Sequence, residues 1–387
     1  MQSSSSSGPS PIKLWVGLPG ELDVVKNGIS DLLNQAIETA TRELGHLNII
    51  IAGRTGVGKS TLINAIFQAN LAETGQGRPV TQDTREINKE GIPLTIFDTR
   101  GLEMSAFAET SDQLRAFVRE RCADRDSNRH IHVAWICIQE DGRRVEDAEI
   151  ALHSLLAEQV PVLAVITKAR ADGGFRQEVQ RLLPQARNVL RVRAIGEELD
   201  DGHTLSPFGL EELVFATSEI IPEGKRRALA AAQKASLQYK KTQARKVVAG
   251  ASAAAVAAAA TPIPFSDAAL LVPVQIGMLA GITTVFGFDV SKSALSTLIS
   301  SALGVTGAML AGRSLAAGLL KLFPGAGSIA GATIAASTAS AVTAALGEAY
   351  ITVLAQIYQE NPSRKLDMKY VAEKLKEKMR RKSSPEP

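Results

Sequence analysis

A short glycine-rich segment, residues 53–60 (GRTGVGKS), constrains the fold of this chain more than any other feature of its sequence. It follows an apolar, β-branched run at residues 47–52 (LNIIIA) and precedes a run with helical periodicity, TLINAIFQA. A loop of this pattern between a strand and a helix is typical of a phosphate-binding site. Its backbone amides can surround phosphate oxygens, and the helix adds the positive end of its dipole. The segment therefore predicts an α/β fold in which a strand ends at a phosphate-binding loop.

Further strand-like runs continue this pattern to about residue 221. Continuous apolar strands separated by helical segments are typical of a mainly parallel sheet with helices on both faces. The other expected strands are 92–97, 131–138, 160–166 and 188–193, and the segment 78–84 (RPVTQDT) is expected to be a polar loop. His130 and His132 alternate at the start of one strand, and we expect them at the sheet edge rather than on a metal ion.

The glycine-rich loop predicts specific roles toward a nucleoside triphosphate. Lys59 would reach the β- and γ-phosphates, and the Ser60 hydroxyl would bind Mg²⁺. Gly53 and Gly58 would let the backbone wrap so that its amides point inward. The nucleotide-binding residues expected here are Gly53, Arg54, Thr55, Gly56, Val57, Gly58, Lys59, Ser60 and Thr61.

Two later segments supply candidates for the metal and for catalysis. Asp98 ends the run PLTIF and begins DTRG, where a carboxylate can hold Mg²⁺ through water and the Gly101 amide can touch the γ-phosphate. Thr81 can close over the metal from the polar loop, although Thr74 or Thr84 could serve instead. The expected metal ligands are Ser60, Thr81 and Asp98, and the expected catalytic residues are Thr81 and Gly101.

Three strings in this order, GRTGVGKSTLINAIF, RPVT and FDTRG, resemble the Era-like and septin-like class of small GTPases. Within that class the chain is most similar to immunity-related and dynamin-like relatives. The resemblance covers roughly residues 47–221 and implies an enzyme that hydrolyses GTP and binds GTP or GDP with Mg²⁺. We expect a homodimer through the GTPase domain and no specific nucleic acid as a partner.

The chain departs from this class where the class reads the base. The class carries Asn/Thr-Lys-x-Asp after a strand, whereas residues 167–170 read TKAR. Lys168 can still lay its stem along the base, but Arg170 offers no acceptor for the hydrogen bonds that guanine donates. Either Asp172 takes that role or guanine specificity is weakened. The expected base-site residues are Thr167, Lys168, Asp172 and Ala194, the last from a weak match to the Ser-Ala-Lys motif of the class.

The catalytic devices of the class are also missing from their usual positions. Leu102 stands where many small GTPases place a Gln that orients the attacking water. Gly56 stands where potassium-dependent relatives carry Asn. Three nearby charged residues are candidates, although each is expected to be solvated or at an interface: Arg54, Arg100 and Glu103. We therefore expect slow intrinsic hydrolysis that dimerisation or a partner raises.

The C-terminal half changes abruptly to Ala, Gly, Ser and Leu. Its uncharged runs reach bilayer-spanning length and are 247–266, 268–288, 293–312 and 322–347. Run 268–288 contains ten Leu, Ile, Val or Phe residues and is expected to insert, whereas run 322–347 contains six and is marginal. Basic segments flank the region: 225–246 carries eight Lys or Arg and no acid, and 364–382 carries nine basic and three acidic residues.

This pattern leaves two interpretations of the helical region open. We expect it to contact an anionic membrane from the cytoplasmic side, either peripherally or by insertion, since basic residues gather at cytoplasmic ends. The phrase TPIPFSDAALLVPVQIGML resembles a bacterial membrane-associated domain that is fused to such GTPases. The alternative is a soluble, nucleotide-switched interaction module with little or no turnover. The two cysteines, Cys122 and Cys137, suit the reducing cytoplasm.

The expected organisation has five parts. They are a disordered tail at 1–20, an N-terminal helix at 21–46, an α/β GTPase domain at 47–221, an all-α domain at 222–360 and a basic amphipathic tail helix at 361–387. The N-terminal helix is expected to be a strut against another domain. A basic helix is expected at 225–246, and helix breaks are expected at Pro262 and Pro264, at 287–293 and at Pro324 and Gly325. The tail helix should carry an apolar stripe of Met368, Val371, Leu375 and Met379.

Overall fold

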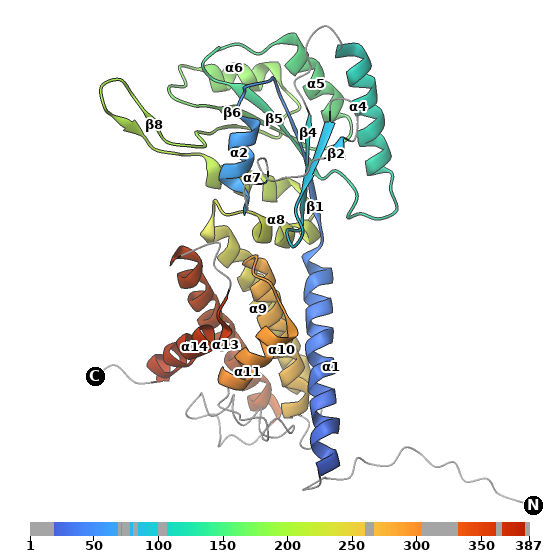
Figure 1. The fold of residues 1–387 in the computed structure, drawn as a ribbon, viewed down its shortest axis with the longest axis vertical. Helices are drawn as coiled ribbons and strands as arrows, with labels where there is room; N and C mark the ends of the chain where they lie inside the picture. Colours follow the sequence, from blue (N-terminus) through green and yellow to red (C-terminus); the bar gives the residue numbers. More distant parts are fainter. Residues whose placement is uncertain are drawn as a thin grey trace, which may run out of the picture.

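The chain has an α/β part and a helical part, stacked along the long axis of the molecule (Figure 1). The computed structural model describes residues 19–68, 71, 78–79, 84–99, 107–259, 267–302, 332–360 and 366–383. Helix α1 (Pro19–Leu44) runs beside the helical part and leads directly into strand β1 (Leu47–Ala52). It packs on helices of that part, as the expected strut should.

A seven-stranded sheet forms the α/β part, in the order β2-β3-β4-β1-β5-β6-β7. The remaining strands are β2 (Arg78–Pro79), β3 (Thr84–Asn88), β4 (Leu94–Thr99), β5 (Val133–Gln139), β6 (Val162–Thr167) and β7 (Asn188–Arg191). In this order, the neighbouring strands β4, β1, β5, β6 and β7 all pair in parallel, which confirms the mainly parallel sheet. Strands β2 and β3 form an antiparallel edge.

The antiparallel pair corrects the expectation of a polar loop at residues 78–84 at its two ends, because Arg78–Pro79 and Thr84 belong to strands, while residues 80–83 lie outside the described residues. Strand β3 pairs with β4 and buries Thr84 and Ile87, while the residues between them are partly exposed. Its sequence, TREIN, includes a single apolar residue, so the strand lacks the continuous apolar run that marks the central strands.

Helices cover both faces of the sheet because successive side chains of each strand point to opposite faces. Ile50 faces a core with α4, α5 and α6, whereas Ile49 and Ile51 face a core with α2, α7 and α8. These helices are α2 (Lys59–Ile66), α4 (Phe107–Cys122), α5 (Asp147–Ala157), α6 (Phe175–Leu182), α7 (Leu210–Ile220) and α8 (Arg226–Ala232). A two-stranded hairpin of β8 (Glu197–Glu198) and β9 (Thr204–Leu205) projects from one side (Figure 1).

The helical part follows a short 3-10 turn, η3 (Glu223–Lys225). Its longer helices are α9 (Leu237–Ala259), α10 (Asp267–Val285), α11 (Lys292–Ala302), α13 (Ala332–Glu360) and α14 (Met368–Ser383). The helix expected over 225–246 is wrong, because α8 and α9 are separate. Gln233 accepts a hydrogen bond from the Ser236 N–H at 2.7 Å, and the Ser236 hydroxyl accepts one from the Tyr239 N–H at 3.0 Å. These polar side chains end one helix and cap the next.

The other helix boundaries agree with the sequence where the structure describes them. Helix α10 ends at Val285 and α11 begins at Lys292, as the break at 287–293 predicts. Helix α9 ends before the two prolines at 262 and 264, and these residues, like Pro324 and Gly325, lie outside the described residues. The stripe predicted for the tail helix is buried: Met368, Val371, Leu375 and Met379. Helix α14 packs on α11 and α13.

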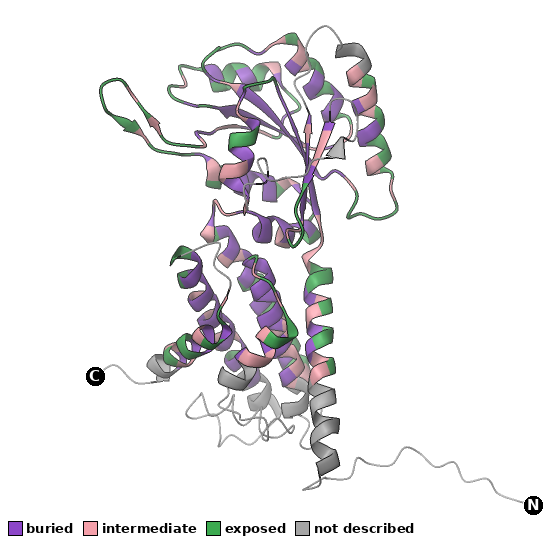
Figure 2. Cartoon of the chain, viewed as in Figure 1, coloured by how far each residue is buried: buried purple, intermediate pink, exposed green. Residues whose placement is uncertain are grey.

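One apolar core continues from the sheet into the helical part (Figure 2). It joins residues of α2 and α7 to residues of α8, α9, α10, α13 and α14. Run 268–288, expected to insert into a membrane, forms an interior helix whose Ile276, Leu279 and Ile282 are buried. Among the described residues one helix segment, Ala339–Glu360, is long and apolar enough to cross a membrane, and most of its apolar stretch is buried inside the protein.

Candidate nucleotide-binding site

The glycine-rich loop connects β1 to α2 at the end of the molecule away from the helical part (Figure 1). Gly53, Gly56 and Gly58 have φ of +142°, +78° and +102°, a region that side chains with a Cβ adopt with strain. A Cβ on Gly53 would overlap the carbonyl oxygen of Cys137 on the neighbouring strand β5. The loop therefore needs glycine both for its backbone conformation and for its close approach to β5.

Lys59 occupies the interior of this loop. Its side chain is buried, and Nζ donates to the carbonyl oxygens of Gly53 at 2.7 Å and Arg54 at 3.2 Å. The Thr167 hydroxyl, at the end of β6, donates to the Val57 carbonyl at 2.6 Å and ties the loop to the neighbouring base site. By contrast, Thr55, Gly56, Ser60 and Thr61 are exposed on the outer side. A buried ammonium in the first turn of a helix, held by two backbone carbonyls, is suited to bind a phosphate group.

Two candidate metal ligands lie at the same edge of the sheet. Asp98 on β4 is in register with Ile51 on β1, one strand from the loop, and Ser60 is in the first turn of α2. A carboxylate and a hydroxyl are oxygen ligands of the kind that Mg²⁺ prefers, so these residues fit the ion and would hold it there. Thr81 and Gly101, together with Arg100, Leu102 and Glu103, lie outside the described residues. Their roles stay predictions.

The cysteine beneath the loop is not a reactive group. Burial raises the pKa of Cys137 to about 12, with a smaller opposing effect of Lys59 and a supporting one of Asp98. The thiol therefore stays protonated at neutral pH and acts as a small apolar side chain. Arg54, in contrast, is exposed and pairs with Glu146 on the rim at 3.1 Å.

A cavity of about 240 Å³ opens beside the loop, where the sequence predicts the base site. The expected residues Gly58, Thr61, Thr167, Lys168 and Ala194 line it. The other lining residues are Leu62, Asp141, Arg170, Val192, Arg193, Ile195, Gly196 and Glu197. Lys168 has φ of +52°, and its Nζ donates to Gln139 Oε1 at 3.3 Å.

Asp172 does not line this cavity. Its Oδ1 accepts the backbone N–H of Arg176 at 2.9 Å, at the start of α6, and lies 3.6 Å from Arg191 Nε. The acids that do line the cavity are Asp141 and Glu197, which sequence reasoning missed. The signal for Glu197 was its place three residues after Ala194, but only the pairing of β7 with β6 brings its side chain beside Arg170.

Arginine–glutamate pairs build the wall of the cavity. Arg170 donates to Glu197 through Nε at 2.9 Å and also through Nη2. Behind it, Arg191 Nε donates to Glu140 Oε1 at 2.7 Å. Burial alone would raise the pKa of Glu140, but the bonds from Arg191 and from the Arg170 backbone hold that pKa below its usual value. Glu140 therefore stays ionised at neutral pH.

Two families match successive parts of the chain. Residues 48–168 match the 50S ribosome-binding GTPase family, and residues 225–381 match a domain of unknown function, DUF697. The tRNA modification GTPase MnmE of Cupriavidus pinatubonensis is 31% identical over 38% of this chain and 32% of its own length. Human Septin-1 is 28% identical over 46% of this chain and 53% of its own length.

Among solved structures, Toc33 from Arabidopsis thaliana in complex with Mg²⁺ and GMPPNP is 16% identical, with a TM-score of 0.33 over 49% of this chain and 90% of that one. The chain spans about a third of the length of MnmE and about half of the length of Septin-1. The family match over residues 48–168, with the similarity to MnmE and Septin-1, supports an Era-like or septin-like GTPase domain.

Proposed function

We propose that this chain, in which a GTPase domain is joined to a DUF697 domain, hydrolyses GTP slowly and couples its nucleotide state to the helical part. Lys59 binds the β- and γ-phosphates, while Ser60 and Asp98 hold Mg²⁺, which neutralises developing charge on the phosphates when bound. Thr81 and Gly101 complete the site around the γ-phosphate. Thr167, Lys168 and Ala194 hold the base.

One contact carries the proposal of coupling: the helix that begins at the phosphate loop ends on the helical part. The Lys234 backbone N–H donates to the Ile66 carbonyl at 2.7 Å, at the last residue of α2. Phe67 forms a β-bridge with Gln233, and Gln68 Nε2 donates to the Ala231 carbonyl at 2.8 Å. A shift of α2 on nucleotide binding would therefore reach the α8–α9 junction through hydrogen bonds.

Lys240 extends this connection into the helical part. It is buried, and its Nζ donates to the carbonyls of Ala230 and Ala231 at the end of α8 and to that of Phe286, just after α10, at 3.1 Å. The same Nζ lies 4.9 Å from the ring centre of Tyr358 on α13. The Lys240 side chain, which extends from α9, thus links α10 and α13 to the end of α8. The residues after α2 contact this same end of α8. Burial lowers the pKa of Lys240 well below its usual value.

Hydrogen exchange of the full chain tests the coupling. With GDP or a non-hydrolysable GTP analogue bound in the presence of Mg²⁺, amide exchange should differ at residues 231–240. The Lys59→Ala variant supplies the control, because its exchange should not respond to nucleotide. Identical exchange in both nucleotide states, with binding verified, would mean that the helical part does not sense the site.

Contact with an anionic membrane is the second part of the proposal. Only some of the basic residues in the helical part are available for such a contact. Of the cluster in α9, Lys240 is buried, Arg245 pairs with Glu348 at 3.1 Å and Lys246 pairs with Glu223 at 3.5 Å. Helix α14 exposes Lys369 and Lys374 on either side of its buried stripe, and Lys374 pairs with Glu377 at 3.4 Å. Each basic residue close to an anionic surface contributes roughly 1 kcal/mol.

Flotation with phosphatidylglycerol vesicles tests this part of the proposal. The double variant Lys369→Glu with Lys374→Glu should lower the floated fraction, and so should raised salt. Lys89→Glu with Arg125→Glu, the same charge change on exposed residues of the GTPase domain, should not. A chain that does not float with the vesicles at low salt, in both nucleotide states, would favour the second candidate, a soluble switch whose helical part binds a protein partner. The burial of α10 and of most of Ala339–Glu360 supports that candidate.

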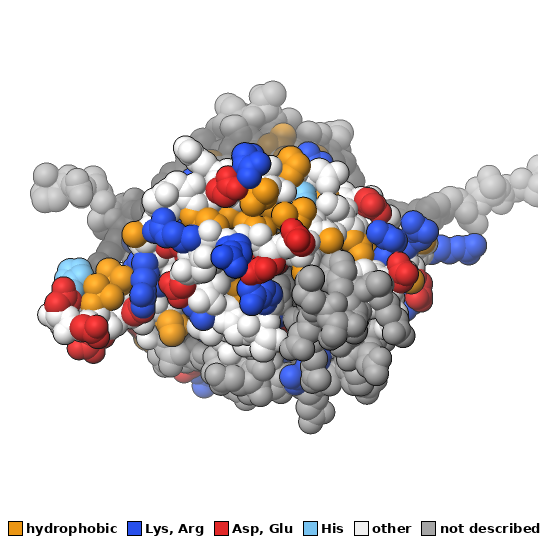
Figure 3. Space-filling view, turned by 90° about the horizontal axis from the view of Figure 1, so that it is seen from above, with side chains coloured by type: hydrophobic (Ala, Val, Ile, Leu, Met, Phe, Trp, Pro, Cys, Tyr) orange, Lys and Arg blue, Asp and Glu red, His pale blue; other side chains and the backbone are white. Residues whose placement is uncertain are grey.

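Homodimerisation through the GTPase domain would supply the missing catalytic stimulation. The end of the molecule that carries the site exposes Lys, Arg, Asp and Glu side chains interspersed with one another (Figure 3). A surface of mixed charge can be complementary to a second copy of itself across a two-fold axis. The turnover per molecule should therefore rise with protein concentration, and a constant turnover over a hundredfold range would contradict stimulation by a second copy.

A further inference from the structure

The base cavity contains a carboxylate that the TKAR segment lacks. Guanine presents the N1–H and N2–H₂ donors side by side with the O6 acceptor, so a site that selects it needs two paired acceptors. Arg170 supplies none, and Asp172 is engaged at the start of α6. Glu197 and Asp141 are the described acids that line the cavity. We propose that Glu197, fixed by Arg170, is the residue that accepts hydrogen bonds from guanine, an inference that rests on the proposed nucleotide site.

Glu197 is held in a defined orientation. Arg170 donates to both of its oxygens, one of them at 2.9 Å, and each oxygen keeps a further lone pair for a ligand. Two donors from one planar guanidinium leave the carboxylate little freedom to rotate. The bonds from Arg170 also hold the pKa of Glu197 below its usual value, so it accepts rather than donates at neutral pH.

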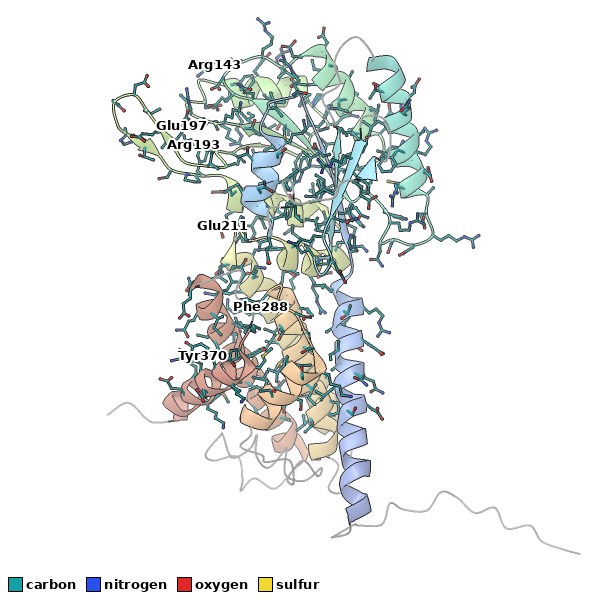
Figure 4. The ribbon with its side chains drawn as sticks, viewed as in Figure 1. Arg143, Arg193, Glu197, Glu211, Phe288 and Tyr370 are labelled. Carbon is teal, nitrogen blue, oxygen red and sulfur yellow. The ribbon has the colours of Figure 1, made fainter. Side chains whose placement is uncertain are left out.

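The segment that carries Glu197 is anchored at the cavity. Arg193 Nε donates to the Ala169 carbonyl at 2.9 Å and Nη1 donates to the Ser206 carbonyl at 2.7 Å. Its guanidinium also lies 4.9 Å from the centre of the Phe208 ring. Arg193 therefore clamps the base of the β8–β9 hairpin to the TKAR segment, and Figure 4 shows Glu197 and Arg193 together at that base.

Asp141 is the weaker candidate for the same role. It is exposed, and its Oδ2 accepts one bond from Gln139 Nε2 at 3.1 Å. An exposed carboxylate fixed by one amide is less well oriented than Glu197, whose side chain is 33% exposed and fixed by two charged bonds. In this arrangement Arg170, which occupies the position of the missing acid, acts as a positioning residue for another acid.

Competition binding of the full chain with Mg²⁺ and GTP, XTP or ATP tests the assignment, with a fluorescent GTP analogue as the displaced probe. Xanthine presents an acceptor where guanine presents N2–H₂, so Glu197→Gln should weaken GTP binding and favour XTP. We expect the ratio of GTP to XTP affinity to fall by about 10-fold to 100-fold, the range for hydrogen bonds to charged groups. Glu198→Gln, on the next residue of the exposed hairpin, is the matched control and should leave that ratio unchanged.

The outcomes separate this inference from the proposed function. A ratio that Glu197→Gln leaves unchanged, or one that shifts only in Asp141→Asn, overturns the role of Glu197 while the nucleotide site stands. The same holds if the natural chain does not prefer GTP over XTP. Probe binding that is absent, or that Lys59→Ala does not weaken, would instead overturn the nucleotide site itself. Arg170→Met should lower the ratio in the same direction as Glu197→Gln, because it frees the carboxylate it holds.

Discussion

The backbone N–H of Lys234 donates to the carbonyl oxygen of Ile66 at 2.7 Å, so the last residue of α2 is bonded to the segment between α8 and α9. The first residue of the same helix is Lys59, whose ammonium lies inside the glycine-rich loop. Helix α2 is therefore fixed at one end by the candidate phosphate site and at the other by the helical part. Because a short helix moves as a rigid unit, the two ends cannot shift independently.

Lys59→Ala should abolish tight binding of a nucleoside triphosphate. Lys59 is the cation that donates into the loop, at 2.7 Å from the Gly53 carbonyl, and Arg54 beside it points to Glu146. Loss of a charged contact to phosphate removes about 2–3 kcal/mol or more, which lowers affinity at least 30-fold. Titration of a fluorescent GTP analogue measures this loss. Lys89→Ala, at an exposed position after β3, serves as the control and should bind as the natural chain does.

Lys240→Met should destabilise the chain more than Lys241→Met. The first substitution removes the donor that three buried carbonyls share, at a cost of about 1–3 kcal/mol in the free energy of unfolding. The neighbouring Lys241 is partly exposed, and its substitution should change stability by less than about 0.5 kcal/mol. Urea unfolding of the two variants measures the difference. Equal stabilities would show that the buried ammonium contributes nothing beyond the packing of its aliphatic stem.

Two glycines in the helical part should respond to alanine in opposite directions. A Cβ on Gly347 of α13 would lie 2.5 Å and 2.9 Å from the two methyl carbons of Val248 on α9, so Gly347→Ala should overpack this crossing. The expected loss is about 1–3 kcal/mol. A Cβ on Gly250 of α9 meets no atom within 4 Å, so Gly250→Ala should gain up to about 1 kcal/mol from helix propensity. Thermal unfolding reports both signs, and a stabilised Gly347→Ala would mean that the crossing is looser than described.

Acid should destabilise the chain through His132. Burial, and then the charge of Lys225, lower the pKa of His132 to about 4. Its Nδ1 accepts the Asn48 N–H at 3.0 Å, and its Nε2 lies 3.0 Å from the Ser127 carbonyl, an arrangement that suits the neutral ring. The unfolded chain binds this proton with a pKa near 6.5, so stability is full above that pH and falls as pH drops toward 4.

From pH 8 to pH 5 this single group should cost about 2 kcal/mol of the free energy of unfolding. Urea unfolding at both pH values measures the loss. His132→Asn should be less stable at pH 8 but should lose less between the two conditions. An equal loss in that variant would assign the acid sensitivity to other groups.

Local patterns in the sequence were enough to predict the parallel strands of the α/β part and its glycine-rich loop. The run GRTGVGKS lies between its strand and helix because glycine conformations, a buried β-branched strand and helical periodicity are properties of neighbouring residues. The same local patterns did not predict β3, whose residues are mostly polar, and they predicted one helix across Gln233 and Ser236 where α8 and α9 are separate. In both cases partners distant in sequence, or hydrogen bonds of polar side chains, decided the structure.

The sequence predicted only part of the chemistry of the base site. The absence of an acid in TKAR is visible in four letters, and so is the basic character of residues 225–246. Which acid lines the cavity, and which lysine is buried rather than on the surface, depends on chain segments that meet only after folding. Glu197 reaches Arg170 because β7 pairs in parallel with β6, so that the segment after β7 lies beside the TKAR segment. Lys240 is buried because three helix segments converge on it. Spacing along the chain carries no record of such long-range contacts, so only the tertiary structure could decide them.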